Sequence, residues 1–202
     1  GEAFTLTSLM SVCRRGRQWQ KALELFRSVD ELGVAVDTGL LGIAITCAAT
    51  GHLWTYALDI LASAQGRVVL NSAAENAAIL ACEKGRQWEM ALSLFANMQT
   101  SDVCGAEGAR KISVITVNSV LSACEKARQW RNALSLLEKF PVLKLQPDTI
   151  SINVAIGACA AGRHWEEAMR HFHHLCRSGH ATHTTHTTTL SSCERAMRWE
   201  DA

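Results

Sequence analysis

The chain has 202 residues, of which 48% are hydrophobic and 19% charged, and its formal net charge is +1 at neutral pH. This balance excludes the strongly basic field that is typical of many nucleic-acid-binding domains. No apolar run reaches the length of a membrane-spanning helix, so no membrane span is predicted.

Six tryptophans divide the sequence at nearly equal intervals of 35, 34, 42, 35 and 34 residues. They are Trp19, Trp54, Trp88, Trp130, Trp165 and Trp199. An alanine follows each of them by three residues, and a cysteine precedes five of them by six residues. A fixed period in the mid-thirties indicates a repeat array, in which each unit buries its apolar face against its neighbours.

The tryptophan is taken as the seventeenth place of a copy, which sets the predicted boundaries. The copies span residues 3–37, 38–71, 72–113, 114–148, 149–182 and 183–202, the last one incomplete. The third copy has seven residues more than the fourth, and we place the surplus in a loop near 102–111, which contains two glycines. Since the chain starts without a methionine and stops inside a copy, we expect a piece of a longer protein.

The fourth copy shows the two predicted helices of a unit. Val117, Leu121 and Cys124 recur at helical spacing and predict the apolar stripe of a first helix. Arg128 and Gln129 predict a polar connection. The second helix has a predicted apolar face formed by Trp130, Ala133, Leu134 and Leu137.

Prolines mark the end of the same copy. Pro141 is expected to interrupt or end the second helix, and Pro147 with Asp148 closes the unit. No convincing alternation of apolar and polar residues predicts strands. The predicted fold is therefore all-α, an α-solenoid of stacked helical hairpins of about 35 residues each.

The cysteines are read as small buried residues in a reducing compartment rather than as a disulfide framework. Five of the eight occupy the same place in successive copies, where stacked helices lie too far apart for a disulfide. Cys104 and Cys176 lie off this pattern and receive no role.

The first helices decide between two families of helical hairpin. The tetratricopeptide signature W-x2-L-G-x2-Y is absent from every copy. The segments AENAAILAC, TVNSVLSAC and SINVAIGAC, with the endings VAVD and LQPD, resemble those of pentatricopeptide repeat (PPR) proteins. The resemblance covers essentially the whole chain and implies a right-handed superhelix that binds single-stranded RNA, with one base read per repeat by two side chains.

In the family these two side chains stand at the fifth and the last place of each repeat. The positions that match are Thr7, Asp37, Asn71, Asn76, Ser113, Asn118, Asp148, Asn153, Thr182 and Thr187. The family code assigns guanosine to copy one, a pyrimidine such as cytidine to copy three, uridine to copy four and an unspecified pyrimidine to copy five. Gly42 stands at the fifth place of copy two and has no side chain with which to read a base. An asparagine near a helix start can instead cap the backbone, which is the structural alternative for these positions.

The family also places an aliphatic residue at the second place, where it wedges against the base. Phe4, Ile115 and Ile150 match this role. The corresponding Gly39, Ala73 and Thr184 do not.

Two other groups of residues were considered as sites. Six of the eight histidines lie in residues 171–186 with Cys176, but the spacing matches no zinc motif, so an exposed histidine patch is favoured over a metal site. The histidines are His171, His173, His174, His180, His183 and His186. Four arginines precede a tryptophan by two residues and could form a phosphate-contacting stripe, although a solvated turn is favoured. They are Arg17, Arg86, Arg128 and Arg163.

The resemblance therefore implies an RNA-binding adaptor of a chloroplast or mitochondrion, without a cofactor and without a DNA partner. No nucleophilic arrangement and no phosphate-binding glycine loop is visible, so an enzyme is not predicted. The alternative is a protein-binding scaffold in a large organellar complex, because the concave surface of a helical solenoid suits proteins equally well. The near-neutral charge and Gly42 favour this alternative, whereas the pairs Asn118/Asp148 and Thr7/Asp37 oppose it.

Overall fold

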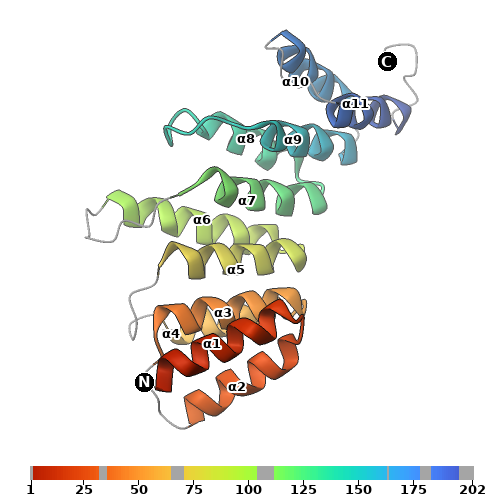
Figure 1. Ribbon diagram of the computed structural model, residues 1–202. Helices are drawn as coiled ribbons and strands as arrows, with labels where there is room; N and C mark the ends of the chain where they lie inside the picture. The colour runs from red at the N-terminus through yellow and green to blue at the C-terminus, as the bar shows by residue number, and fades with distance from the viewer. Residues whose placement is uncertain are drawn as a thin grey trace. The chain divides into compact units, whose positions relative to one another are not determined.

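The computed structural model describes residues 2–31, 36–64, 71–103, 112–162, 164–177 and 183–195, and over these ranges the chain is helical without strands (Figure 1). The helices are α1 Glu2–Arg15, α2 Trp19–Glu31, α3 Thr38–Thr50, α4 Trp54–Ala64, α5 Ser72–Lys84, α6 Trp88–Val103, α7 Val114–Lys126, α8 Trp130–Lys139, α9 Thr149–Ala161, α10 Trp165–Arg177 and α11 His183–Arg195. Each even-numbered helix begins at one of the periodic tryptophans. The prediction of an all-α solenoid of helical hairpins is confirmed.

The helices form two compact units, Gly1–Lys111 and Ile112–Ala202. In the first unit, α3 packs against α1, α2, α4 and α5. In the second unit, α9 packs in the same way against α7, α8, α10 and α11. The first helices of successive hairpins are therefore neighbours within each unit, which places their side chains in reach of one another.

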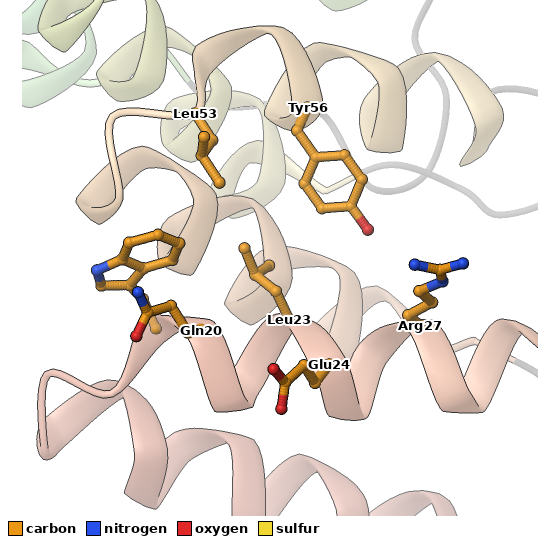
Figure 2. A pocket seen from close by; sticks show the side chains of 7 residues that line it. Gln20, Leu23, Glu24, Arg27, Leu53 and Tyr56 are labelled. Atoms are coloured by element: carbon orange, nitrogen blue, oxygen red, sulfur yellow. The ribbon is translucent and has the colours of Figure 1, made fainter.

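A hollow of about 500 Å³ opens between α2 and α4 in the first unit. Leu23 of α2 points toward Leu53 and Tyr56 (Figure 2). The charged residues Glu24 and Arg27, also on α2, contribute to the lining of the hollow. The hollow belongs to the second helices, whereas the predicted RNA-reading residues lie on or next to the first helices.

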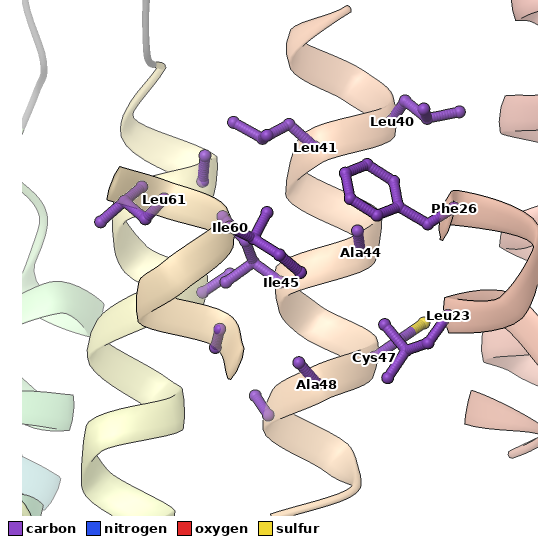
Figure 3. Packing of buried hydrophobic residues seen from close by; sticks show 14 of the residues in the cluster. Leu23, Phe26, Leu40, Leu41, Ala44, Ile45, Cys47, Ala48, Ile60 and Leu61 are labelled. Atoms are coloured by element: carbon purple, nitrogen blue, oxygen red, sulfur yellow. The ribbon is translucent and has the colours of Figure 1, made fainter. Parts of the chain in front are cut away.

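The core of the first unit is built around α3, which is apolar on nearly all sides. Leu40, Ala44 and Cys47 face Phe26 and Leu23 of α2 (Figure 3). On the other side Leu41, Ile45 and Ala48 face Ile60 and Leu61 of α4 (Figure 3). A helix without a polar face is stable only when neighbours cover it, and here the hairpins on both sides do so.

The first helices end in a sharp left-handed turn. Arg17, His52, Arg86 and Arg128 have φ angles of 55°, 60°, 56° and 59°. In the first of these turns the Gln18 N–H donates to the Cys13 carbonyl over 2.9 Å, which closes the helix end. The predicted polar connection is confirmed, but its left-handed geometry, more usual for glycine, was not predicted.

Each described tryptophan–glycine pair joins one hairpin to the next. A Cβ built on Gly51 would lie 2.7 Å from Cε3 of Trp19. The same construction gives 2.6 Å from Gly85 to Cδ1 of Trp54 and 2.8 Å from Gly162 to Cδ1 of Trp130. The indole ring therefore packs on the turn of the following hairpin, and only glycine leaves it room.

The second helix of the fourth hairpin differs in part from the prediction. Ala133 is buried as expected, but Leu134 and Leu137 are half-buried. Leu136 and Phe140 are fully buried instead. The reason is that α8 packs against two helices, α7 and α9, so its buried residues do not form a single stripe. The helix ends at Lys139, so Pro141 follows its end and does not interrupt it.

The periodic cysteines are free thiols, and four of them, Cys82, Cys124, Cys159 and Cys193, are buried as predicted, whereas Cys13 is half-buried. Cys47, which stands next to the periodic place of the second copy, is also buried. Burial raises the pKa of the Cys82 and Cys124 thiols to about 11. Burial, with a contribution from the carboxylate of Glu167, raises the pKa of Cys159 to about 11 as well. These thiols are protonated at neutral pH and act as small apolar residues, as predicted.

The predicted loop near 102–111 lies largely outside the described residues. Asp102 and Val103 belong to the end of α6, and residues 104–111 are not described. Across the described helices, none combines the length and the apolar character needed to cross a lipid bilayer.

Candidate nucleic-acid interface

The predicted last-place residues share one structural role, because each described one caps the first helix of the following hairpin. The Asp37 carboxylate accepts from the Leu40 N–H over 2.6 Å, and Asn71 Oδ1 accepts from the Ala74 N–H over 2.9 Å. Ser113 likewise caps α7 and Asp148 caps α9. Capping at these described helix starts therefore falls on the last place of the predicted repeat, and Asn71 is an asparagine in this role.

The predicted fifth-place residues lie inside the first helices. Asn76, Asn118 and Asn153 are each the fifth residue of their helix and are half-buried. Thr187 is exposed on α11, where its hydroxyl donates to the Thr184 carbonyl over 3.0 Å. Gly42 has open space above it, since a Cβ built there would meet no atom within 4 Å.

Asn118 and Asp148 meet at the junction of α7 and α9. Asn118 Nδ2 lies 3.2 Å and 3.3 Å from the two carboxylate oxygens of Asp148. The hydroxyl of Ser151 lies 2.6 Å from Asn118 Oδ1 and 2.8 Å from Asp148 Oδ1, so its one hydrogen is shared between these two acceptors. The Ser151 N–H donates to Asp148 Oδ1 over 2.7 Å. The structure thus brings together the two side chains that the sequence assigned to one base.

Asp148 remains ionised in this setting. Partial burial acts to raise the pKa of its carboxyl, but the backbone and side chain of Ser151, the Asn118 amide and the Ile150 backbone donate to it and lower the pKa overall. A carboxylate that accepts several hydrogen bonds favours its charged form. The site therefore presents a negative, acceptor-only group beside a carboxamide.

Asn153 has a related pair of partners on α11. Its Nδ2 donates to the Thr184 hydroxyl over 3.1 Å, and the buried Thr185 hydroxyl donates to its Oδ1 over 2.7 Å. Thr182, the predicted partner of Asn153 in base reading, lies outside the described residues. The sequence analysis assigned no role to Ser151 and Thr185. Each stands at the third place of its copy, and the preceding copy has an asparagine at its fifth place.

Two of the predicted wedging residues are exposed large apolar side chains. Ile115 is 74% exposed and Ile150 is 61% exposed, each three residues before a fifth-place asparagine. Residues three apart share one face of a helix, so each isoleucine lies one turn away from the neighbouring carboxamide. Phe4 lies in α1, but its side chain is outside the described part of the structure.

The first hairpin brings its predicted pair together around a glycine. A Cβ built on Gly39 would lie 3.5 Å from Asp37 Oδ1 and 3.9 Å from Thr7 Cγ2. Thr7 and Asp37 therefore flank the second place of the next hairpin, where this chain has no wedging side chain.

Comparison with known proteins gives a single family. The model of the PPR repeat matches residues 4–34, 76–103 and 115–143. Three segments of this chain are therefore PPR repeats. Comparison of the sequence with curated proteins finds no significant match.

Solved structures of PPR proteins share the fold. The maize protein PPR10 superposes with a TM-score of 0.75 at 22% identity over 96% of this chain, which spans 27% of the length of PPR10. The PPR domain of Arabidopsis thaliana protein-only RNase P 1, solved with tRNA, gives a TM-score of 0.76 at 11% identity, with both chains covered over their full length. Nuclear proteinaceous RNase P 2 from A. thaliana gives 0.78 at 12% identity over 96% of this chain and 43% of its own.

The described arginines of the predicted stripe stand at the turns that end the first helices. Arg17, Arg86 and Arg128 are exposed at the left-handed turns that end the first helices, while Arg163 is not described. Asn118 and Arg128 are ten residues apart along the chain, so about 15 Å of helix axis separates them. The solvated turn remains the interpretation that fits this placement.

The described part of the histidine segment lies on α10 and α11. Among the described residues, no group of three or more His, Cys, Asp or Glu side chains could hold a metal ion. His173, His183 and His186 are exposed, and His186 makes an edge contact with Phe172 at 5.0 Å between ring centroids. His174 has no described side chain, and His180 lies outside the described ranges.

Proposed function

We propose that this chain is a PPR-type adaptor that binds single-stranded RNA along the first-helix face, with one base per hairpin. The paired Asn118 and Asp148, flanked by the exposed Ile115 and Ile150, carry the proposal. Two of the structural neighbours were solved with RNA, namely PPR10 with an 18-nt psaJ RNA element and the protein-only RNase P 1 domain with tRNA. The proposed role is RNA processing, stabilisation or translation in a chloroplast or mitochondrion, as the family resemblance implies.

The chemistry of the pair favours uracil over cytosine in the fourth hairpin. A carboxylate accepts hydrogen bonds only, so it suits the N3–H donor of uracil and repels the N3 lone pair of cytosine. The carboxamide of Asn118 supplies a donor for a base carbonyl beside it. The exposed isoleucines offer apolar surface against the faces of the bases.

The experiment is a fluorescence-anisotropy titration with short single-stranded RNAs that differ only at the nucleotide assigned to the fourth hairpin. Asp148→Asn keeps the helix cap, because Asn and Asp cap equally well, but removes the negative acceptor. We expect the preference for uridine over cytidine to fall by roughly three- to tenfold, the range of one hydrogen bond.

Asp59→Asn is the matched control, since it makes the same change of charge at an exposed position in the middle of α4. It should leave base preference unchanged. Two outcomes would contradict the assignment of Asn118 and Asp148 to base reading. One is an equal loss of uridine preference in both variants, and the other is an unchanged preference in a folded Asp148→Asn variant.

The alternative function is a protein-binding scaffold that no longer reads RNA. The hollow between α2 and α4, whose lining includes Leu23, Leu53 and Tyr56, is the observation that favours this alternative. Absence of RNA binding at low salt by the wild-type chain would favour this function, and Tyr56→Ala would then be the variant to test against a captured partner.

A further inference from the structure

Two buried hydroxyl groups contact the carboxamides of the preceding hairpins in the same way. Ser151 Oγ donates to Asn118 Oδ1 over 2.6 Å, and Thr185 Oγ1 donates to Asn153 Oδ1 over 2.7 Å. Each hydroxyl belongs to the third residue of a first helix, α9 or α11, and both side chains are 0% exposed. The contact therefore recurs between successive hairpins of the second unit.

The contact fixes which end of the carboxamide faces outward. A carboxamide has two donors at one end and an acceptor at the other, and half a turn about its last bond exchanges them. In the observed orientation Asn118 Oδ1 accepts from Ser151 and Nδ2 faces the Asp148 carboxylate. The reversed orientation would set two acceptors, Oδ1 and the carboxylate, against each other, and it would leave Asp148 Oδ1 as the acceptor for the Ser151 hydroxyl.

The sequence couples the two residue types across the chain. Where the fifth place is asparagine, the third place of the next copy is a hydroxyl residue, as in Asn76/Thr116, Asn118/Ser151 and Asn153/Thr185. Where the fifth place lacks a carboxamide, the third place of the next copy is apolar, as in Thr7/Leu40 and Gly42/Ala74. Ser151 and Thr116 also pair with the cap residues Asp148 and Ser113 of their own helices, and the carboxamide of the preceding copy offers a third-place hydroxyl a further acceptor.

We propose that Ser151 and Thr185 are positioning residues for base recognition, an inference that rests on the proposed function. Each holds the acceptor of the preceding carboxamide inside the protein, so that its amide donor is the group left for the base. In the fourth hairpin this donor and the Asp148 carboxylate together match a base with a carbonyl next to an N–H. The hydroxyl contributes to specificity without touching RNA.

The first test removes the hydroxyl. Ser151→Ala should lower the uridine-over-cytidine preference at the fourth hairpin by roughly three- to tenfold, the range of one hydrogen bond, and Ser151→Thr should restore it. In the free protein, the side-chain amide resonances of Asn118 should shift and lose protection from exchange in Ser151→Ala but not in Ser151→Thr. Thermal unfolding of each variant establishes that it is folded.

Thr189→Ala is the matched control. Its hydroxyl is also buried, but it donates to the Thr185 carbonyl of its own helix over 2.8 Å and contacts no carboxamide. It should change neither the base preference nor the amide resonances of Asn118. A loss of uridine preference in Thr189→Ala equal to that in Ser151→Ala would overturn the proposal, because a general weakening of the helix packing would then explain both losses.

A second test builds the contact where the chain lacks it. Open space surrounds Gly42, and the α5 cap has the arrangement of the α9 cap, since Asn71 accepts from the Ala74 N–H as Asp148 accepts from the Ser151 N–H. Gly42→Asn with Ala74→Ser should therefore create base discrimination at the nucleotide of the second hairpin. Gly42→Asn alone should give a weaker preference, and equal preferences in the two variants would count against the hydroxyl.

The outcomes separate this inference from the proposed function. If the wild-type chain binds no RNA, the proposed function fails, and the Asn118 resonances still decide whether the hydroxyl orients the amide. If Ser151→Ala leaves those resonances unchanged, the positioning role is wrong. If the wild-type protein prefers uridine, and Ser151→Ala changes the resonances but keeps that preference, then the amide orientation does not control specificity and the proposal is overturned.

Discussion

Asp148 does two things with one carboxylate. It caps α9 through the Ser151 N–H and it pairs with the Asn118 amide. Asp148→Ala would therefore remove a helix cap together with the reading carboxylate, and loss of such a cap costs about 1 kcal/mol. Substitutions that keep the cap, such as Asp148→Asn, separate recognition from stability.

Because the pKa of Asp148 is lowered in the folded chain, the free energy of unfolding depends on pH in the acidic range. Since the pKa is lower in the folded chain than in the unfolded one, the stabilisation is complete above about pH 4 and is lost as pH falls through the folded-state value. The difference in unfolding free energy between wild type and Asp148→Asn should therefore shrink between pH 6 and pH 2. Urea unfolding at these pH values measures it, with Asp59→Asn as control. A difference that stays constant over this range would mean that the carboxylate is not held in its charged form.

At the scale of the element, the tryptophan that opens each second helix acts on the next hairpin. The ring of Trp19 occupies the space above Gly51, at the end of α3. Ala127 stands at the equivalent C-cap of α7 with φ −89°, so the backbone of this turn accepts a Cβ. The requirement for glycine at position 51 thus comes from the indole ring and not from the backbone angle.

Gly51→Ala should lower the free energy of unfolding by about 1–3 kcal/mol, as overpacking of a filled site does. Gly16→Ala is the matched control, because a Cβ there meets only Val12 O at 3.4 Å and Cys13 O at 3.7 Å, both in its own helix. It should leave stability nearly unchanged. Urea unfolding followed by circular dichroism compares the two, and equal effects would contradict the packing of Trp19 on Gly51.

At the scale of the whole molecule, a net charge of +1 means that RNA affinity must come from local groups. Two or more phosphate contacts with single-stranded RNA predict a slope of about −1.4 or steeper for log affinity against log salt. The turn arginines lie about 15 Å along the helix axis from the reading residues. We therefore expect Arg86→Asn with Arg128→Asn to leave this slope unchanged, since asparagine also tolerates the left-handed turn.

Anisotropy titrations at several salt concentrations test this expectation. A slope that becomes shallower by about 0.7 per arginine removed would place these arginines on phosphates and establish the basic stripe. A protein-binding scaffold, in contrast, need not show steep dependence on salt.

The sequence alone was enough to predict the hairpin array, because the period of tryptophan, alanine and cysteine is repeated in the chain and helical spacing is local. It also placed Asn118 and Asp148 at one site, through the family resemblance. It misplaced part of the buried face of α8, where Leu136 and Phe140 are covered, since two neighbouring helices decide that face.

The contacts between hairpins could be identified only in the folded chain. Trp19 packs on a glycine 32 residues later, and the hydrogen bond from Ser151 to Asn118 joins residues 33 positions apart. Such contacts depend on how one hairpin stacks on the next, which periodicity within a helix does not specify. For the same reason the sequence left Ser151 and Thr185 without a role, although their hydroxyls hold the carboxamides that it singled out.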